Sequence, residues 1–443
     1  MSPLSLDRKM MNSSPSIPID FMVEILSRLP ANSVARFHCV SKLWASTLSS
    51  SYFKELFMAK SLAKPRLLFA IGENGNDKGK AKGYGMWSFF SLPQLENPFE
   101  KSTSSTTLVA SAESHVQKFS PASIDIDYYS NIKYFSCGYN SGLIYFHGSR
   151  YQGRPVICNP NTGHYAVLPK KYTYRKAYSF FGFDPIDKQY KALFMAYPSG
   201  PGHHSVLTFG AGDMKWRKID CSVRHEIKSD GVCINGVLYY LGDTSDCDND
   251  AHEGLSDYVV VCFDVRSEKF SFICVERFCR LVDYKGKLAV VFWEDDFDFY
   301  EAATFELDVD DYLEENLNAV ANNELHVWVL EDVEKQEWSK HAYCWSTDGI
   351  FFRRQVSIAG VTASGEIVFS TRKYTPKQPF YVFYFSPEQN TLQRVEIQGF
   401  GEAFKKPCSV LTVVNHVEDL HVNDSELLKP SFEDSNYSNS DSE

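Results

Sequence analysis

The 443-residue sequence lacks the features of several large functional classes. It has no run of about 18 apolar residues that could cross a membrane, and its first residues, MSPLSLDRKMMNSSPS, contain no apolar core of signal-peptide length. Its 45 Lys and Arg residues are outnumbered by 56 Asp and Glu residues and form no basic stripe of the kind that binds phosphate backbones. We therefore expect a soluble, intracellular protein of the cytoplasm or nucleus that binds neither a membrane nor nucleic acid.

Paired cysteines and clustered metal ligands are also missing. The eleven cysteines are odd in number, form no Cys-x-x-Cys pair and mostly lie in apolar runs, which is typical of reduced, buried thiols. His203 and His204 are adjacent, so a strand would point them to opposite sides, and no third ligand is spaced near them. No metal and no cofactor are expected.

One Gly- and Lys-rich stretch, residues 72–85, approaches a phosphate-binding loop without meeting its requirements. The spacing from Gly75 through Gly79 to Lys80 is one residue too short. Ala81 stands where Ser or Thr would hold magnesium. The stretch favours an inter-strand loop.

A second stretch, residues 243–257, resembles the start of a calcium loop because it carries Asp at alternate positions from Asp246 to Asp250. Ala251 replaces the Gly needed for the sharp turn, and Asp257 replaces the bidentate Glu. This pattern favours a solvated acidic loop.

No Gly-x-Ser-x-Gly elbow occurs, and nothing in the sequence predicts a catalytic residue.

The composition is typical of a folded protein with much β structure, since 44% of the residues are apolar and 15% are aromatic. The length allows a small domain beside a large one. The stretch from Glu418 to Glu443 holds eight acids and one Lys, and so seven of the eleven net negative charges. We expect residues 1–16 and 418–443 to be disordered, the second as a solubilising tail.

Residues 17–63 are expected to form a small helical domain. Phe21, Ile25 and Leu29 recur at i, i+4 and i+8, which predicts a first helix from Asp20 to Leu29 that is ended by Pro30. Ser33 can cap a second helix, and a third carries the apolar positions between Val40 and Leu48. A segment this short buries little surface, so a partner or the rest of the chain must cover it.

The run from Ile17 to Phe53 closely resembles the F-box, especially its plant form. It departs from that pattern at Ile17, Phe21, Val34 and His38. It matches at sixteen positions, which are Pro18, Asp20, Glu24, Ile25, Leu26, Arg28, Leu29, Pro30, Ser33, Arg36, Phe37, Cys39, Val40, Ser41, Lys42 and Trp44.

The resemblance implies that these helices bind a Skp-type adaptor, which bridges to a cullin scaffold. The alternative is that the same apolar residues form the core of an ordinary helical hairpin. Carried over by position, the adaptor contacts would be Pro18, Phe21, Ile25, Leu26, Leu29, Pro30, Val40 and Trp44.

The rest of the chain repeats two kinds of β-hairpin. One kind joins two apolar strands by a polar turn and occurs at 156–168, 206–219, 259–273, 326–341 and 380–397. The other has Gly at its turn and occurs at 137–146, 233–241, 282–292 and 361–370. Paired, they give four-stranded units of about 50 residues, the period of kelch-like propeller blades.

Residues 65–71 and 86–92 supply an incomplete further unit. We therefore predict a mainly β protein, in which the helical F-box is followed by a β-propeller of about six or seven blades. A β-sandwich or a stack of meanders is the alternative. Phrases such as ICNPNTG, FGFDPIDKQYKAL and YFSPEQNTLQRVEIQGF make residues 65–415 similar to the F-box associated domain of type III found in crucifer plants.

Two aromatic-rich loops are candidates for a substrate surface, because propeller loops vary without disturbing the blades and exposed aromatics favour interfaces. Aromatic residues buried in blades are the alternative interpretation. The candidate substrate-binding residues are Tyr172, Tyr174, Tyr178, Trp293, Phe297 and Tyr300.

Together these features predict a non-catalytic substrate-recognition subunit of a Skp-cullin-F-box (SCF) ubiquitin ligase. It would bind the adaptor through the F-box and an unknown protein target through the propeller, so that the target is ubiquitinated. The alternatives are a propeller that binds a glycan or small molecule, a copper oxidase resembling galactose oxidase, and an F-box protein acting outside a ligase.

Overall fold

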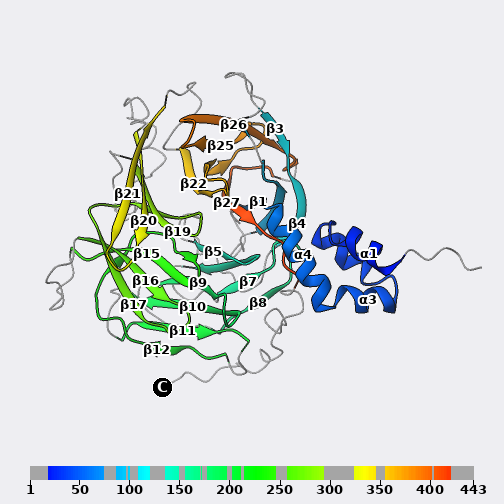
Figure 1. Ribbon diagram of the computed structural model, residues 1–443, viewed down its shortest axis with the longest axis horizontal. Coiled ribbons are helices and arrows are strands. Elements are labelled where there is room, and N and C mark those ends of the chain that lie inside the picture. The colour runs from blue at the N-terminus through cyan, green and yellow to red at the C-terminus, as the bar shows by residue number, and fades with distance from the viewer. Residues whose placement is uncertain are drawn as a thin grey trace, which may run out of the picture.

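A computed structural model of the protein describes residues 18–73, 86–95, 98–99, 108–119, 135–148, 155–169, 171, 177–196, 202–210, 214–245, 257–293, 324–345, 355–401 and 404–420. A small helical domain lies beside a large ring of β-sheets (Figure 1). The helices are α1 (Ile19–Leu26), α2 (Ala31–Phe37), α3 (Lys42–Leu48) and α4 (Ser51–Ala63).

The helix ends follow from proline and serine. A proline disfavours helical backbone at the residue before it, so Leu29, which precedes Pro30, does not continue the first helix. That helix ends at Leu26, short of the predicted Leu29, and the second helix begins directly after Pro30. The side chains of Ser41 and Ser50 accept backbone N–H bonds and cap α3 and α4. The predicted cap at Ser33 is wrong, since this residue lies inside α2. The fourth helix is an addition to the three predicted.

The strands of the described residues form six sheets arranged around a ring, so the predicted propeller has six blades (Figure 1). From the centre outward, blade 1 holds β27 (Cys408–His416), β1 (Arg66–Glu73), β2 (Met86–Pro93) and β4 (Glu113–Phe119), with β24 (Lys373–Tyr374) beside β27. Blade 2 holds β5 (Phe135–Asn140), β6 (Leu143–Gly148), β7 (Val156–Cys158) and β8 (Tyr165–Val167). Blade 3 holds β9 (Ala177–Asp184), β10 (Gln189–Ala196), β11 (His204–Thr208) and β12 (Arg217–Ile219).

The remaining three blades continue the ring. Blade 4 holds β13 (Glu226–Ile227), β14 (Val232–Ile234), β15 (Val237–Asp243), β16 (Tyr258–Asp264) and β17 (Phe270–Val275). Blade 5 holds β18 (Arg280–Tyr284), β19 (Lys287–Trp293), β20 (Glu324–Asp332) and β21 (Glu337–Cys344). Blade 6 holds β22 (Val356–Val361), β23 (Ile367–Thr371), β25 (Phe380–Ser386), β26 (Thr391–Gln398) and β3 (Leu108–Ser111). All nine predicted hairpins are confirmed.

Two pairings between distant segments close the ring. The last strand, β27, pairs antiparallel with β1, with Leu68 opposite Val413. The early strand β3 pairs parallel with β26 and becomes the outermost strand of blade 6, with Leu108 opposite Val395. An early strand thus completes blade 6, and the last strand completes blade 1.

The middle strands of the blades are buried on both faces, because each sheet packs between two neighbours. In β16 the five residues from Val259 to Phe263 are all buried, which explains their continuous apolar run. Outer strands such as β21 have most residues exposed or half-buried. The core is thus a series of apolar layers between blades.

The tight hairpin turns of the inner strands gather on one face of the ring, which we call the turn face. Asn235 and Gly236 both have positive φ, 49° and 86°, as a two-residue type I′ hairpin turn requires. Asn235 Nδ2 donates to the Gly286 carbonyl in the next blade at 3.0 Å, and Asn415 Nδ2 donates to the Val361 carbonyl at 2.8 Å. Since paired strands alternate in direction, the strand ends that flank residues 168–176 and 294–323 lie on the opposite face, the loop face.

Candidate functional site

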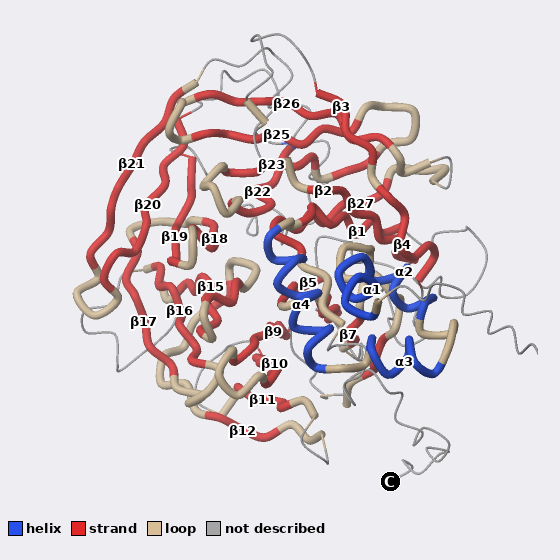
Figure 2. The backbone as a smooth tube through the Cα atoms, turned by 45° about the vertical axis from the view of Figure 1, so that its right-hand side comes forward, coloured by secondary structure: helices blue, strands red, loops and turns tan. Residues whose placement is uncertain are grey.

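The helical domain is attached to blade 1 at the turn face by two chain segments. Lys64 and Pro65 join α4 directly to β1. Beyond β27, residues Val417 to Leu420 form a second connection, which we call the C-terminal strap. Figure 2 shows the helices lying beside β1, β4 and β27. Since β1 and β27 are paired, both connections leave the propeller from one place.

The strap is held by the helices through polar and apolar contacts. The Glu418 backbone N–H donates to Ser61 Oγ at 2.8 Å, and Glu418 Oε2 accepts from the Ala31 backbone N–H at 2.7 Å. Leu420 is 7% exposed and belongs to the core of the helical domain, which also contains Val23, Leu26, Ala31, Val34, Leu48, Phe53 and Phe57. The strap is therefore part of the helical domain's own fold.

On its other side, the strap is fixed to the propeller through His416, which is fully buried. His416 Nε2 lies 3.2 Å from the Asn161 side-chain oxygen, so Nε2 donates and Nδ1 accepts from the Tyr139 hydroxyl at 2.9 Å. The Val417 N–H donates to the same Tyr139 oxygen at 3.1 Å. Burial lowers the pKa of His416 to about 3, with a smaller contribution from His115, so this imidazole is neutral at physiological pH.

A second polar chain joins α2 to blade 1 through His115. Its Nε2 lies 2.6 Å from Ser91 Oγ, and its Nδ1 lies 3.4 Å from Asn32 Nδ2 in α2. Arg66 donates to Ser91 Oγ at 2.7 Å and pairs with Glu113 at the same distance. Burial, helped by the Arg66 charge, lowers the pKa of His115 to about 4. A neutral His115 is thus a second polar link between the two domains.

The helical domain exposes several large apolar side chains. Phe21 is 65% exposed and Ile25 is 55% exposed, and with Pro18 they lie on one face of α1 at i, i+3 and i+7. Val40 and Leu43, before and in α3, are 59% and 57% exposed. We call Pro18, Phe21, Ile25, Val40 and Leu43 the exposed apolar set. Soluble domains seldom leave large apolar side chains together in water without a partner.

The adaptor contacts predicted from the sequence divide by position. Pro18, Phe21, Ile25, Pro30 and Val40 are exposed, whereas Leu29 and Trp44 are half-buried. Leu26 is 4% exposed, so its prediction as a surface contact is wrong: it lies on the inner face of α1 beside Val23. Sequence reasoning omitted Leu43, although the spacing from Val40 placed it among the apolar positions of the third helix.

The predicted substrate-binding aromatics are resolved only in part. Tyr172, Tyr174, Phe297 and Tyr300 lie outside the described residues. Tyr178 is half-buried in β9. Trp293 is 6% exposed and packs against Trp345 and Phe369 between blades, so its prediction as an exposed contact is wrong.

The two stretches whose sequences resemble a phosphate-binding loop and a calcium loop lie largely outside the described residues. Residues 74–85 and 246–256 lie outside the described residues. Of the adjacent histidines, His204 is buried next to His225, with ring centroids 5.9 Å apart. Across the described ranges, no three His, Cys, Asp or Glu side chains are grouped as metal ligands, and the nine cysteines whose side chains are described form no disulfide. No helix in this part of the protein is long and apolar enough to span a bilayer.

The fold and the site define a two-part protein, with a small helical domain fixed to a six-bladed propeller. Residues 15–56 match the F-box domain, and residues 66–417 match the F-box associated β-propeller domain. The Arabidopsis thaliana F-box proteins At2g15640 and At2g16450 are each 67% identical, over 95% of this chain and 96% of their own. F-box protein At1g47340 of the same plant is 52% identical, over 95% of this chain and 86% of its own. The chain belongs to the F-box proteins that carry an F-box associated β-propeller domain. Membership supports, in general, a substrate-receptor role in SCF ubiquitin ligases.

Proposed function

We propose that this protein is a non-catalytic substrate receptor whose exposed apolar set binds a Skp-type adaptor and thereby a cullin scaffold. The observation that supports this most strongly is the exposure of Phe21 and Ile25 on a helix whose other face is buried. Covering such side chains removes apolar surface from water, at about 25 cal/mol per Å². The protein would act inside the cell, in the cytoplasm or the nucleus.

The attachment of the F-box supports the same function. A receptor promotes ubiquitination by holding a target lysine near the conjugating enzyme, and this effect depends on a defined geometry. Here the F-box is held by Lys64 and Pro65, by the strap and by the His115 contacts. We infer that the propeller holds its target protein at a fixed orientation relative to the adaptor.

The experiment that tests the proposal is the affinity of the full chain for a purified Skp-type adaptor, measured by calorimetry. Phe21→Ser/Ile25→Ser should weaken binding by at least about a hundredfold, since two buried anchors are worth about 1.4 kcal/mol or more each. Leu62→Ser is the matched control, because Leu62 is 57% exposed on α4 and lies outside the exposed apolar set.

Unchanged affinity in Phe21→Ser/Ile25→Ser, with the same thermal stability as the parent chain, would contradict the proposed binding face. A parent chain that does not bind the adaptor would contradict the proposed function itself.

A further inference from the structure

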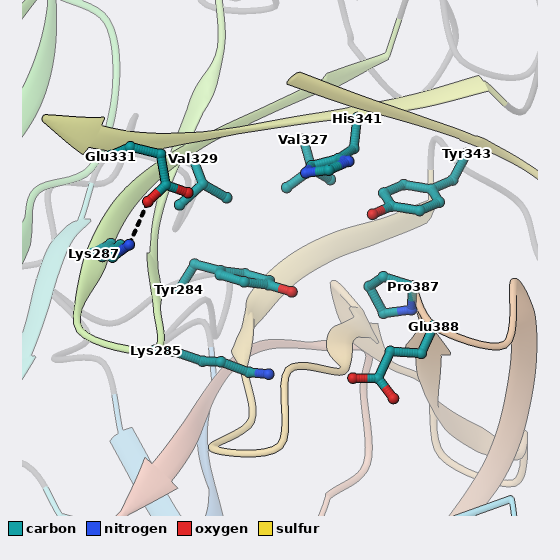
Figure 3. Close-up of a pocket in the computed structure, with 10 residues that line it drawn as sticks. All are labelled: Tyr284, Lys285, Lys287, Val327, Val329, Glu331, His341, Tyr343, Pro387 and Glu388. Carbon is teal, nitrogen blue, oxygen red and sulfur yellow. Dashed lines mark hydrogen bonds and ion pairs between the residues drawn. The ribbon is translucent and has the colours of Figure 1, made fainter. Parts of the chain in front are cut away.

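A cleft at the turn face separates blades 5 and 6 (Figure 3). It encloses about 400 Å³, room for one or two large side chains. Its residues come from β18 to β21 on one side and from the turn between β25 and β26 on the other.

The cleft has an apolar floor and amphipathic walls. Buried Val327 and Val329 form the floor, and Tyr284, Tyr343 and His341 stand around the open space (Figure 3). Burial raises the pKa of both tyrosines, so both hydroxyls stay protonated at neutral pH and can donate. Such a site suits one apolar or aromatic side chain with polar groups at its edges.

The mouth of the cleft carries one charge of each sign. Lys287 is paired with Glu331, but no ion pair is formed between Lys285 and Glu388, which lie together at the rim (Figure 3). A ligand with a large net charge of either sign is therefore disfavoured.

The outer wall of the cleft is also the outer edge of blade 5. His341 and Tyr343 belong to β21, which at eight residues is the longest outermost strand among the described blades. Lys340, His341 and Ala342 are all exposed. Within the described residues, no strand pairs with the free side of β21, and an edge of this length can accept another strand.

The neighbouring blade shows the same kind of edge already occupied. In blade 6 the outer strand β26 is covered by β3, an extended segment from a distant part of the chain, over four residue pairs from Val395–Leu108 to Gln398–Ser111. Strand addition is thus how this propeller completes one blade, whereas in the described part of the chain the outer edge of the blade beside it is unpaired and lies next to a side-chain-sized cleft.

We propose that β21 binds an extended segment of the target protein as an added strand, which places one large apolar side chain of that segment in the cleft. This inference rests on the proposed function, because the bound segment would belong to the target. An added strand supplies backbone hydrogen bonds, and the cleft selects the side chain. The cleft is open on one side and would leave much of a small molecule in water, which favours a peptide.

Selection from a display library of random peptides tests the proposal on the full chain. The peptides should be about twelve residues long, enough to span the eight residues of β21. Selected peptides should share one large apolar residue between residues of β propensity and should slow hydrogen exchange of amides in residues 337–344. Tyr284→Ala and His341→Ala should each weaken a selected peptide by about tenfold or more.

The matched control is Ile186→Ala, since Ile186 is a 69% exposed apolar residue in the turn between β9 and β10. It should leave peptide affinity unchanged. The proposal is overturned if no peptide is selected, if the two cleft variants bind as tightly as the parent, or if protection appears away from β21. It is also overturned if sedimentation shows a dimer and exchange of residues 337–344 slows as the dimer forms. Adaptor affinity, measured separately, is unaffected by any of these results, so failure here is distinct from failure of the receptor function.

Discussion

At the scale of single residues, Glu418 is the side chain that fastens the strap to the helical domain. Its Oε2 accepts from the Ala31 N–H, while Oε1 is buried and has no hydrogen-bond partner among the described residues. Burial raises the pKa of Glu418 above its usual range, opposed by the Ala31 bond and the Arg66 charge. When the pKa of a carboxyl is higher in the folded state, the group stabilises the fold at pH values below the pKa of the unfolded state, here about 4.5. This stabilisation is lost as the pH rises through the pKa of the folded state.

Two substitutions of Glu418 should therefore behave differently at pH 7. Glu418→Gln keeps an acceptor for Ala31 and removes a desolvated charge, so the free energy of unfolding should stay equal or rise. Glu418→Ala leaves the Ala31 N–H unpaired and should lower the free energy of unfolding by about 1–2 kcal/mol. Urea unfolding of both variants measures the difference. A Gln variant that is as unstable as the Ala variant would contradict this role for the bond.

Buried His416 should make the protein sensitive to mild acid. Its folded-state pKa of about 3 lies below the usual 6.5, so its contribution to stability is present above pH 6.5 and is lost as pH falls toward 3. At pH 5.5 the loss should be about 1.4 kcal/mol from this residue. The free energy of unfolding should therefore change less between pH 7.5 and pH 5.5 in His416→Gln than in the parent chain, by about that amount. An unchanged difference would show that His416 is not held neutral in the fold.

The sequence could predict which type of residue forms a contact but not always which way it points. Phe21 and Ile25, predicted as adaptor contacts, are exposed, whereas Leu26 was predicted from the same family pattern and is buried. The one-residue step from Ile25 to Leu26 turns the side chain by about 100° around the helix, which is enough to exchange surface for core. The prediction that Trp293 is an exposed contact was wrong for a similar reason. Trp293 is the last residue of β19, and its side chain faces the next blade.

At the scale of elements, the strap is the feature that sequence reasoning assigned wrongly. Its acidic composition predicted a disordered tail from Glu418 onward, but Glu418 and Leu420 are buried. Composition could not reveal this, because the partners Ala31 and Ser61 lie more than 350 residues earlier in the chain. The hairpins were predicted well because each depends on neighbouring residues only.

Two truncations should separate the strap from the residues that follow it. A chain ending at Leu420 should keep the exchange rates of the full protein. A chain ending at Val417 loses the Leu420 packing and both Glu418 bonds, together worth about 3 kcal/mol. Amides of α1 to α4 should then exchange at least about tenfold faster, while the blades are unchanged. Equal exchange in both truncated chains would contradict a structural role for the strap.

At the scale of the whole molecule, the F-box and the loop face lie at opposite ends of the propeller strands. The sequence predicted a propeller and the order of the two domains, but not the closure of the ring by β27 and β3, which pair with strands hundreds of residues away. Nor could it show that the F-box lies at the turn face. These features depend on long-range pairing, for which local patterns carry no signal.

Hydrogen exchange of the full chain with and without a Skp-type adaptor tests the central claim most directly. The account predicts slower exchange in residues 18–48, which contain α1 to α3 and the exposed apolar set, and unchanged exchange in the six blades. Protection in the blades, or no protection in residues 18–48 when the adaptor is bound, would contradict it.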